Sequence, residues 1–270
     1  MDPRRQEHHM TGWDEIRYEV ADGVATLTMH RPERRNAMTN RMVRETAEAL
    51  AVAAADTSLR VLVLTGAGNT FCPGADLAWV AGGGETAPED RLNPDHFRIP
   101  QLLHEMPAVT IAAVNGACAG AAMGWACACD LRFATRSARF NTAFLDVGVA
   151  GDMALPWSLP HLLGAAKARE LMFLPDKFDA DEARRIGLVA RVFGDDTFAA
   201  DVSAAIDRLT AASPAALSTL KRNFLDAEQH GVGDFAVVEA ERHLALFRLD
   251  DTREAFAAKV EKRRPNFTGR

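Results

Sequence analysis

The chain has 270 residues, of which 48% are hydrophobic and 25% are charged, and this mixture is typical of a globular protein rather than a disordered one. The net charge is −6 and no basic stripe is present, which argues against a nucleic-acid partner. Four cysteines without CxxC spacing argue against disulfides and a zinc site, and they fit a reducing cytoplasm.

The first part of the chain predicts a hairpin, a helix and a buried strand. Residues typical of strands fill Ile16–Val20 and Val24–His30, and the turn signal at 21–23 joins them. Thr39 is expected to cap a helix whose apolar residues recur at helical spacing. The continuous apolar run Val61–Thr65 indicates a buried strand.

The middle of the chain repeats the order of strand, turn and helix. Short helices are expected over Asp76–Val80 and Phe97–Met106, and residues 85–94 between them resemble a mobile surface loop. Val109–Cys129 has no formal charge, but Asn115–Gly116 interrupts it. We therefore expect a buried strand, a turn and a buried helix there, and no membrane span. Two short strands follow, at Leu131–Thr135 and Ala138–Asn141.

The last third of the chain is predicted to be helical. The expected helices are Gly164–Leu174, Ala180–Ile186, Phe198–Thr210, Pro214–His230, Phe235–Leu249 and Asp251–Arg263. Strands and helices thus alternate first and helices alone follow, which favours an α/β body with a helical appendage. We divide the chain into an N-terminal tail over 1–12, a core over 13–197 and a helical C-terminal region over 198–270.

One segment, Thr65–Leu77, brings a buried strand through a glycine-punctuated turn to the start of a helix. Free backbone N–H groups and the positive end of the helix dipole gather at such a start. Pro73 has no N–H to donate, and Gly74 lets a ligand approach the backbone closely. The N–H of Ala75 is therefore the expected donor to a ligand.

A second segment, Ala113–Trp125, has the same organisation. Small side chains over 117–122 allow an elongated ligand to lie against the backbone. Two such helix starts can direct two N–H groups at one carbonyl oxygen, and that arrangement is an oxyanion hole. The alternative is that the glycines of both segments only serve tight turns.

Together the two segments resemble the signatures of the crotonase (enoyl-CoA hydratase/isomerase) superfamily. The first signature is similar to FxxGxD, seen here as Phe71, Gly74 and Asp76, and the second is similar to Asn115–Gly116 followed by small residues and Asp130. Further similar stretches are His30–Ala37, Ile186–Val189 and Glu261–Phe267. The resemblance extends from about residue 14 to residue 267.

This resemblance implies an α/β spiral of repeated ββα units and a C-terminal helical region that forms a homotrimer or a hexamer. It implies an acyl-CoA thioester as the substrate and no separate cofactor, since coenzyme A is part of that substrate. The thioester oxygen would accept hydrogen bonds from the N–H groups of Ala75 and Ala121. The implied substrate contacts are Arg35, Ala37, Gly74, Asp76, Leu77, Gly120, Phe144 and, from a neighbouring subunit, Lys262.

The chain departs from the family pattern at both glutamates with which a hydratase of this family activates water. Gly124 and Phe144 stand there, and neither side chain can transfer a proton. Asp152 falls where the dienoyl-CoA isomerase and ring-1,2-epoxyphenylacetyl-CoA isomerase branches have an acidic residue. Near an apolar acyl pocket its pKa would be raised. We therefore predict isomerisation of a double bond or ring, with Asp152 as the acid/base.

Other interpretations stay open from the sequence alone. Asp152 can instead be a helix cap or a loop residue. Asp146 is a second candidate for the acid/base, because it shares a face with Phe144 if that segment is extended. The alternative functions are an enoyl-CoA hydratase with a noncanonical base and a non-catalytic acyl-CoA-binding protein.

Overall fold

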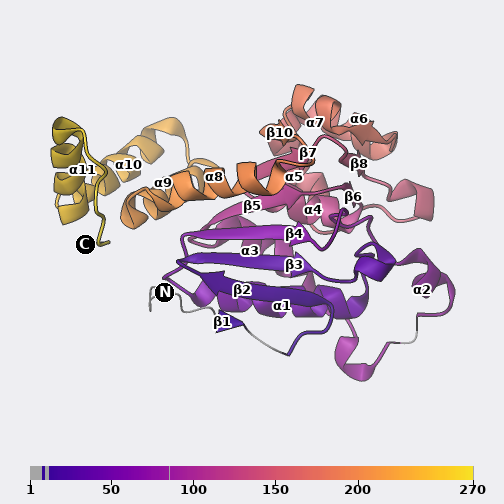
Figure 1. The fold of residues 1–270 in the computed structure, drawn as a ribbon. Coiled ribbons are helices and arrows are strands. Elements are labelled where there is room, and N and C mark those ends of the chain that lie inside the picture. The colour runs from indigo at the N-terminus through magenta and orange to yellow at the C-terminus, as the bar shows by residue number, and fades with distance from the viewer. Residues whose placement is uncertain (1–7, 10–11, 85, 270) are drawn as a thin grey trace.

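Two β-sheets form the centre of the computed structural model, which describes residues 8–9, 12–84 and 86–269 (Figure 1). The larger sheet has the strand order β1-β2-β3-β4-β5-β7-β10, and all pairs from β3 to β10 are parallel. Its strands are β1 (His8–His9), β2 (Ile16–Ala21), β3 (Val24–Met29), β4 (Val61–Gly66), β5 (Val109–Val114), β7 (Leu131–Thr135) and β10 (Arg191–Phe193). The smaller sheet contains β6 (Ala117–Ala119), β8 (Arg139–Asn141) and β9 (Phe178–Asp179).

The predicted hairpin is confirmed. Ile16 pairs with Met29 and Ala21 with Val24, so only Asp22 and Gly23 form the turn. Both have positive φ, 52° and 76°, as a turn that matches the twist of the strands requires. Part of the expected N-terminal tail is ordered, because β1 pairs antiparallel with β2.

Helices cover both faces of the larger sheet at its centre, because the central strands β4 and β5 are apolar on both sides. On β4, Leu62 and Leu64 face the core that includes α1 (Asn40–Ala55), α3 (Ile99–Glu105) and α4 (Ala121–Ala128). Val61 and Val63 face the opposite side. Phe198 and Val202 of α8 (Phe198–Thr210) pack there. Thus α8, the first helix of the predicted C-terminal region, covers the core sheet.

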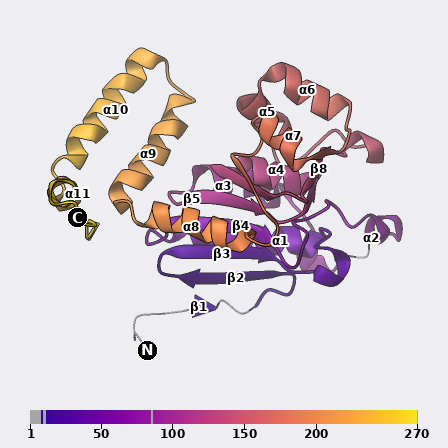
Figure 2. The same ribbon diagram turned by 45° about the horizontal axis from the view of Figure 1, so that its top comes forward.

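The remaining C-terminal helices extend away from the sheets. They are α9 (Pro214–Ala227), α10 (Val232–Leu246) and α11 (Asp250–Glu261). In both ribbon views α11 lies at the opposite end of the molecule from α2 (Leu77–Ala81) (Figures 1 and 2). Between core and appendage the chain forms α5 (Leu155–Leu163), α6 (Ala165–Phe173) and α7 (Ala180–Arg185).

Two expected helices begin later than predicted. Residues 94–98 form a 3-10 helix before α3, since Pro100 lacks an N–H for regular helical bonding at its start. After Asn115–Gly116 the chain first forms β6, which pairs with β8. This tertiary pairing delays α4 to Ala121.

Asp130 fastens α9 to the beginnings of β5 and β7. Its Oδ2 accepts hydrogen bonds from the N–H of Thr110 at 2.7 Å and lies 2.8 Å from Nζ of the buried Lys221 on α9. This family landmark therefore has a structural role in the chain, at the amino ends of the strands. Within the described residues, no helix is both long and apolar enough to cross a bilayer.

Candidate active site

The two glycine-containing turns lie against each other at the carboxyl ends of β4 and β5. The N–H of Cys72 donates to the carbonyl of Ala117 at 2.9 Å, and the N–H of Ala119 donates to the carbonyl of Cys72 at 3.0 Å. A Cβ added to Gly74 would lie 3.2 Å from the Ala119 oxygen, and one added to Gly120 would lie 3.8 Å from Gly74 Cα. Glycine at 74 thus permits close contact between the two backbones, whereas glycine at 120 is favoured by its φ of 56°.

The residue that follows the glycine of each turn, Ala75 after Gly74 and Ala121 after Gly120, has a backbone N–H group that bonds no described acceptor. The neighbours of Ala75 bond to Met38, since the Met38 N–H donates to the Gly74 carbonyl at 2.8 Å and the Asp76 N–H donates to the Met38 carbonyl at 2.9 Å. Among the described residues, no acceptor bonds the N–H of Ala75 or of Ala121. Ala121 is the first residue of α4, where no intrahelical acceptor exists. At five residues, α2 is too short to add the dipole that the sequence suggested.

Two asparagines that the sequence did not assign to the site hold the first turn in place. Asn36 Nδ2 donates to the carbonyl oxygens of Ala67 at 2.9 Å and Thr70 at 2.7 Å. Asn115 Nδ2 donates to the carbonyl oxygens of Gly66 at 2.7 Å and Gly68 at 2.9 Å. The positive φ of Asn36, 59°, is the conformation that asparagine tolerates best after glycine.

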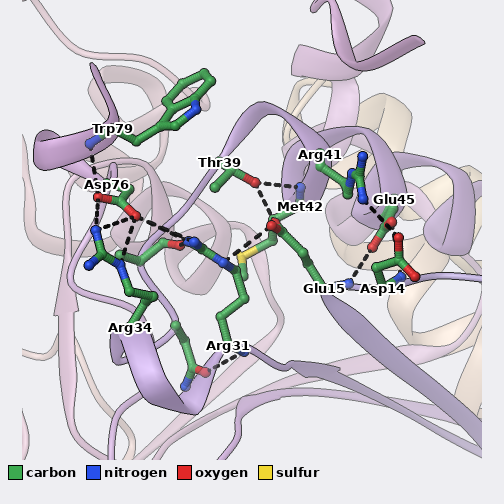
Figure 3. Close-up of polar contacts among 12 residues, drawn as sticks. Asp14, Glu15, Arg31, Arg34, Thr39, Arg41, Met42, Glu45, Asp76 and Trp79 are labelled. Carbon is green, nitrogen blue, oxygen red and sulfur yellow. Dashed lines mark hydrogen bonds and ion pairs between the residues drawn. The ribbon is translucent and has the colours of Figure 1, made fainter. Parts of the chain in front are cut away.

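An ion-pair cluster around the buried Asp76, which we name the Asp76 cluster and which also contains Arg31 and the half-exposed Arg34, lies next to the Ala75 donor in the chain (Figure 3). Asp76 also caps α2 by accepting from the Trp79 N–H at 3.2 Å. Burial alone would raise the pKa of Asp76, but hydrogen bonds from Arg34 and the Trp79 N–H together lower it below its usual range. The carboxylate therefore stays charged and bound within the chain at neutral pH.

The expected coenzyme A loop lies next to this cluster. Arg35 is exposed and has φ 54°. The N–H of Ala37 donates to the Arg34 carbonyl at 3.0 Å, and the Ala37 carbonyl accepts from Arg31. Both polar backbone groups of Ala37 are thus already bonded, while the Arg35 carbonyl has no bond to a described residue.

Gly124 has no room for a side chain. Its added Cβ would lie 2.6 Å from the Met153 carbonyl oxygen and 2.8 Å from Met153 Cβ. Gly124 lies one turn beyond Ala121 on α4, and the segment around Met153 fills the space that a side chain at position 124 would need. This contact brings Asp152 to the amino-terminal half of α4.

Asp152 lies in a strained segment. Gly151, Met153 and Ala154 have φ of 114°, 46° and 52°. Non-glycine residues adopt such angles only where the surroundings enforce them, and they are frequent at active sites. The cap interpretation of Asp152 is wrong, because Ala154 is the N-cap of α5 and no side chain bonds there.

One oxygen of the Asp152 carboxyl group is buried away from solvent. This oxygen, Oδ1, has no hydrogen-bond partner. Burial raises the pKa of Asp152 above its ordinary value. A buried carboxyl oxygen without a hydrogen-bond partner is free to accept a proton.

The raised pKa of Asp152 predicts a pH-dependent difference in stability between the wild type and Asp152→Asn. Between the unfolded pKa, about 3.9, and the higher folded pKa, the folded state binds the extra proton, so wild-type stability falls as pH rises. Asparagine does not titrate and escapes this loss. Urea unfolding of both proteins across this pH range measures the difference, and parallel stability curves would contradict the raised pKa.

The close contact between Gly124 and Met153 predicts that even one methyl group added at position 124 destabilises the fold. Gly124→Ala is expected to lower the free energy of unfolding by about 1–3 kcal/mol, because its Cβ overlaps the Met153 backbone. Gly233→Ala on α10 is the matched control, since its added Cβ meets nothing within 4 Å. Gly233→Ala should raise the free energy of unfolding by up to about 1 kcal/mol, because alanine favours a helix more than glycine does. Equal effects in denaturant titrations would show that Gly124 is not constrained by Met153.

Three further residues that the sequence assigned to the site lie in different places. Phe144 is buried beside the second turn, whose Gly120 N–H donates to the Asn141 carbonyl at 3.1 Å. Leu77 is exposed at the start of α2. Lys262 is the C-cap of α11, and α11 lies at the opposite end of the molecule from α2 (Figure 1).

The expectation that Asp146 shares a face with Phe144 is wrong. Leu145–Val147 form a 3-10 helix rather than an extended segment, and Asp146 is exposed there. All four cysteines are free and buried, as predicted for inert thiols. Burial raises the pKa of the Cys72 thiol to about 12.

Two turns in mutual contact, each with an N–H group that bonds no described acceptor, thus lie at the ends of two parallel strands in an α/β fold of the crotonase type. The sequence profile described as "Enoyl-CoA hydratase/isomerase" matches residues 19–270, so the chain belongs to the enoyl-CoA hydratase/isomerase family.

The chain is similar to known proteins over nearly its whole length. It is 35% identical over 255 residues to a "Probable enoyl-CoA hydratase" of Rhodobacter capsulatus, covering 94% of this chain and 98% of the relative. It is 35% identical over 256 residues to the 1,2-epoxyphenylacetyl-CoA isomerase of Escherichia coli, covering 93% and 97%. The structure of an enoyl-CoA hydratase from Bacillus anthracis superposes with a TM-score of 0.86 at 25% identity, covering 95% of this chain and all of that one.

Proposed function

We propose that this acyl-CoA enzyme isomerises a double bond or a ring of its substrate, with Asp152 as the acid/base. The observation that carries the proposal is the buried, unpartnered Oδ1 of Asp152. The Gly124–Met153 contact holds this group beside α4, whose first N–H is free. The relative named 1,2-epoxyphenylacetyl-CoA isomerase supports the same type of reaction.

The proposed binding mode places the thioester carbonyl oxygen between the N–H groups of Ala75 and Ala121. Arg35 and Ala37 would lie along coenzyme A, Leu77 and Phe144 along the acyl chain, and no cofactor is required. Hydrogen bonds from both amides strengthen as negative charge develops on the oxygen, and this lowers the barrier to enolate formation.

The proposed reaction is a proton transfer between two carbons. For a substrate with a double bond, Asp152 removes a proton from the α-carbon beside the thioester carbonyl, the C–H electron pair forms the enolate double bond, and the carbonyl π pair moves onto the oxygen. The protonated Asp152 then returns the proton to another carbon, and the electron pair leaves the oxygen again. Water is not consumed, which agrees with Gly124 and Phe144 at the two hydratase positions.

Proton NMR of the reaction in deuterated water tests this function. Wild-type enzyme incubated with β,γ-unsaturated and aromatic ring-epoxide CoA thioesters is expected to give isomers of unchanged mass apart from incorporated deuterium. Products that contain one added water would support the noncanonical hydratase instead. Tight binding without deuterium incorporation into any thioester would support the non-catalytic binding protein.

We also propose that the chain assembles into a trimer or a dimer of trimers through its C-terminal helices. Large apolar side chains are exposed on α9, α10 and α11: Phe224, Val232, Val237, Leu244, Phe256 and Val260. Such a concentration of apolar surface is typical of subunit interfaces. Light scattering of the purified protein tests the proposal, and a monomeric mass would refute it.

A further inference from the structure

A second buried carboxylate, Asp90, holds the chain that returns from α2. Its Oδ2 accepts from Nε of Arg41 at 3.0 Å and its Oδ1 accepts from Nε of Arg44 at 3.0 Å. Only 8% of the Asp90 side chain is exposed. We name these three residues the Asp90 cluster. The sequence suggested a mobile surface loop over 85–94, and the burial of Asp90 corrects that expectation.

The Asp90 cluster is charged at neutral pH. Burial alone would raise the pKa of Asp90, but hydrogen bonds from Arg41 and Arg44 together lower it below its usual range. Both arginines lie on α1, whose position is fixed by its own buried apolar face. The cluster therefore attaches a surface segment to a rigid part of the core.

Hydrogen bonds and packing connect Thr86, four residues before Asp90 in the chain, to α2. The Thr86 hydroxyl donates to the Gly84 carbonyl at 2.9 Å, and the Gly84 N–H donates to the Trp79 carbonyl at 3.0 Å. The Trp79 ring also packs on Gly84, where an added Cβ would lie 3.4 Å from the ring. Gly83, with φ 94°, is one of three consecutive glycines here, so the covalent chain alone fixes the position of α2 poorly.

The segment held in this way presents apolar side chains next to the Ala75 donor. Leu77 and Val80 are 57% and 55% exposed. Three residues apart on a helix, they share one face. α2 begins two residues after Ala75, so a thioester whose oxygen binds the Ala75 N–H would lie near the first turn of α2.

We infer that Asp90 is a positioning residue that sets the preference of the enzyme for the acyl group. It holds α2 where Leu77 and Val80 contact the acyl chain, while the Asp76 cluster keeps the other end of α2 beside the oxyanion donors. The inference rests on the proposed function, because it requires an acyl thioester in the site. It goes beyond that function by separating acyl recognition from coenzyme A recognition.

Calorimetric titration with coenzyme A, acetyl-CoA and octanoyl-CoA tests the inference in wild type, Asp90→Asn and Asp14→Asn. Asp14 is the matched control, because its carboxylate binds the same Arg41 at 2.8 Å but is exposed. In Asp90→Asn the gain in affinity from acetyl-CoA to octanoyl-CoA should fall about tenfold, as for lost burial of about two methylene groups. Affinity for coenzyme A should stay within about twofold of wild type.

Hydrogen exchange of backbone amides measures independently whether Asp90 holds α2 in place. Amides of residues 77–84 should exchange faster in Asp90→Asn and at the wild-type rate in Asp14→Asn. Val80→Ser, which leaves the Asp90 cluster intact, should also reduce the octanoyl gain. This variant changes an exposed side chain and keeps the test valid if Asp90→Asn fails to fold.

The outcomes separate this inference from the proposed function. If wild type gains affinity for octanoyl-CoA and Asp90→Asn or Val80→Ser keeps the full gain, Asp90 does not set acyl preference and only the inference fails. If wild type binds no CoA thioester, the proposed function fails and the inference fails with it. A reduced gain in both variants and a wild-type gain in Asp14→Asn support the inference.

Discussion

Asp152→Asn is expected to slow proton exchange and isomerisation by about 10²–10⁴-fold, the usual contribution of a general acid/base. Asparagine keeps the size of the side chain but cannot accept the substrate proton. Binding of a saturated acyl-CoA should change little, because the oxyanion donors are backbone groups of other residues. The measurement is deuterium incorporation into substrate by NMR, together with calorimetric titration of the saturated thioester.

Asp146→Asn is the control for this prediction. Asp146 is a nearby carboxylate on an exposed 3-10 helix, so its variant should exchange protons at nearly the wild-type rate. Wild-type exchange in Asp152→Asn would refute the assignment of Asp152. A large loss in Asp146→Asn instead would return Asp146 to the role of acid/base.

Ala121→Pro is expected to reduce kcat/KM by about 10²–10³-fold, equivalent to about 3–4 kcal/mol of lost transition-state stabilisation. Proline has no N–H, so one of the two proposed donors disappears. The fold should tolerate it, because Ala121 is the first residue of α4, where proline is favoured. The preceding Gly120 has ψ −131°, outside the helical region that a following proline disfavours.

Ala121→Gly is the matched control for the proline variant. It changes the side chain at the same position but retains the backbone N–H, so it should keep most of the activity. Circular dichroism and thermal unfolding establish that both variants are folded. A folded proline variant with wild-type kcat/KM would show that the Ala121 amide does not stabilise the reaction.

The two turns could be predicted from the sequence because their signals are local. Glycines, a proline and the start of a helix lie within a few residues of each donor, and the structure places both turns in contact. The late start of α4 escaped prediction, because β6 forms through pairing with the distant β8. Strand pairing depends on contacts that propensity along the chain does not contain.

The surroundings of Asp152 and Asp90 could not be predicted either, because they depend on contacts between residues that are far apart in the chain. The lack of space at Gly124 comes from Met153, 29 positions further along the chain. Asp90 stands in a polar stretch with the composition of a loop, and its arginine partners precede it by 49 and 46 positions. Only the folded structure shows that Asp152 Oδ1 is buried without a hydrogen-bond partner and that Asp90 is paired with two arginines.

Infrared difference spectroscopy of a saturated acyl-CoA labelled with ¹³C at the thioester carbonyl examines the paired-amide site directly. Two hydrogen bonds from Ala75 and Ala121 should shift the carbonyl stretch of the bound thioester to lower frequency than in water, and Ala121→Pro should diminish the shift. A bound thioester whose stretch stays at its aqueous frequency in the wild type would contradict the oxyanion hole on which the proposed reaction depends.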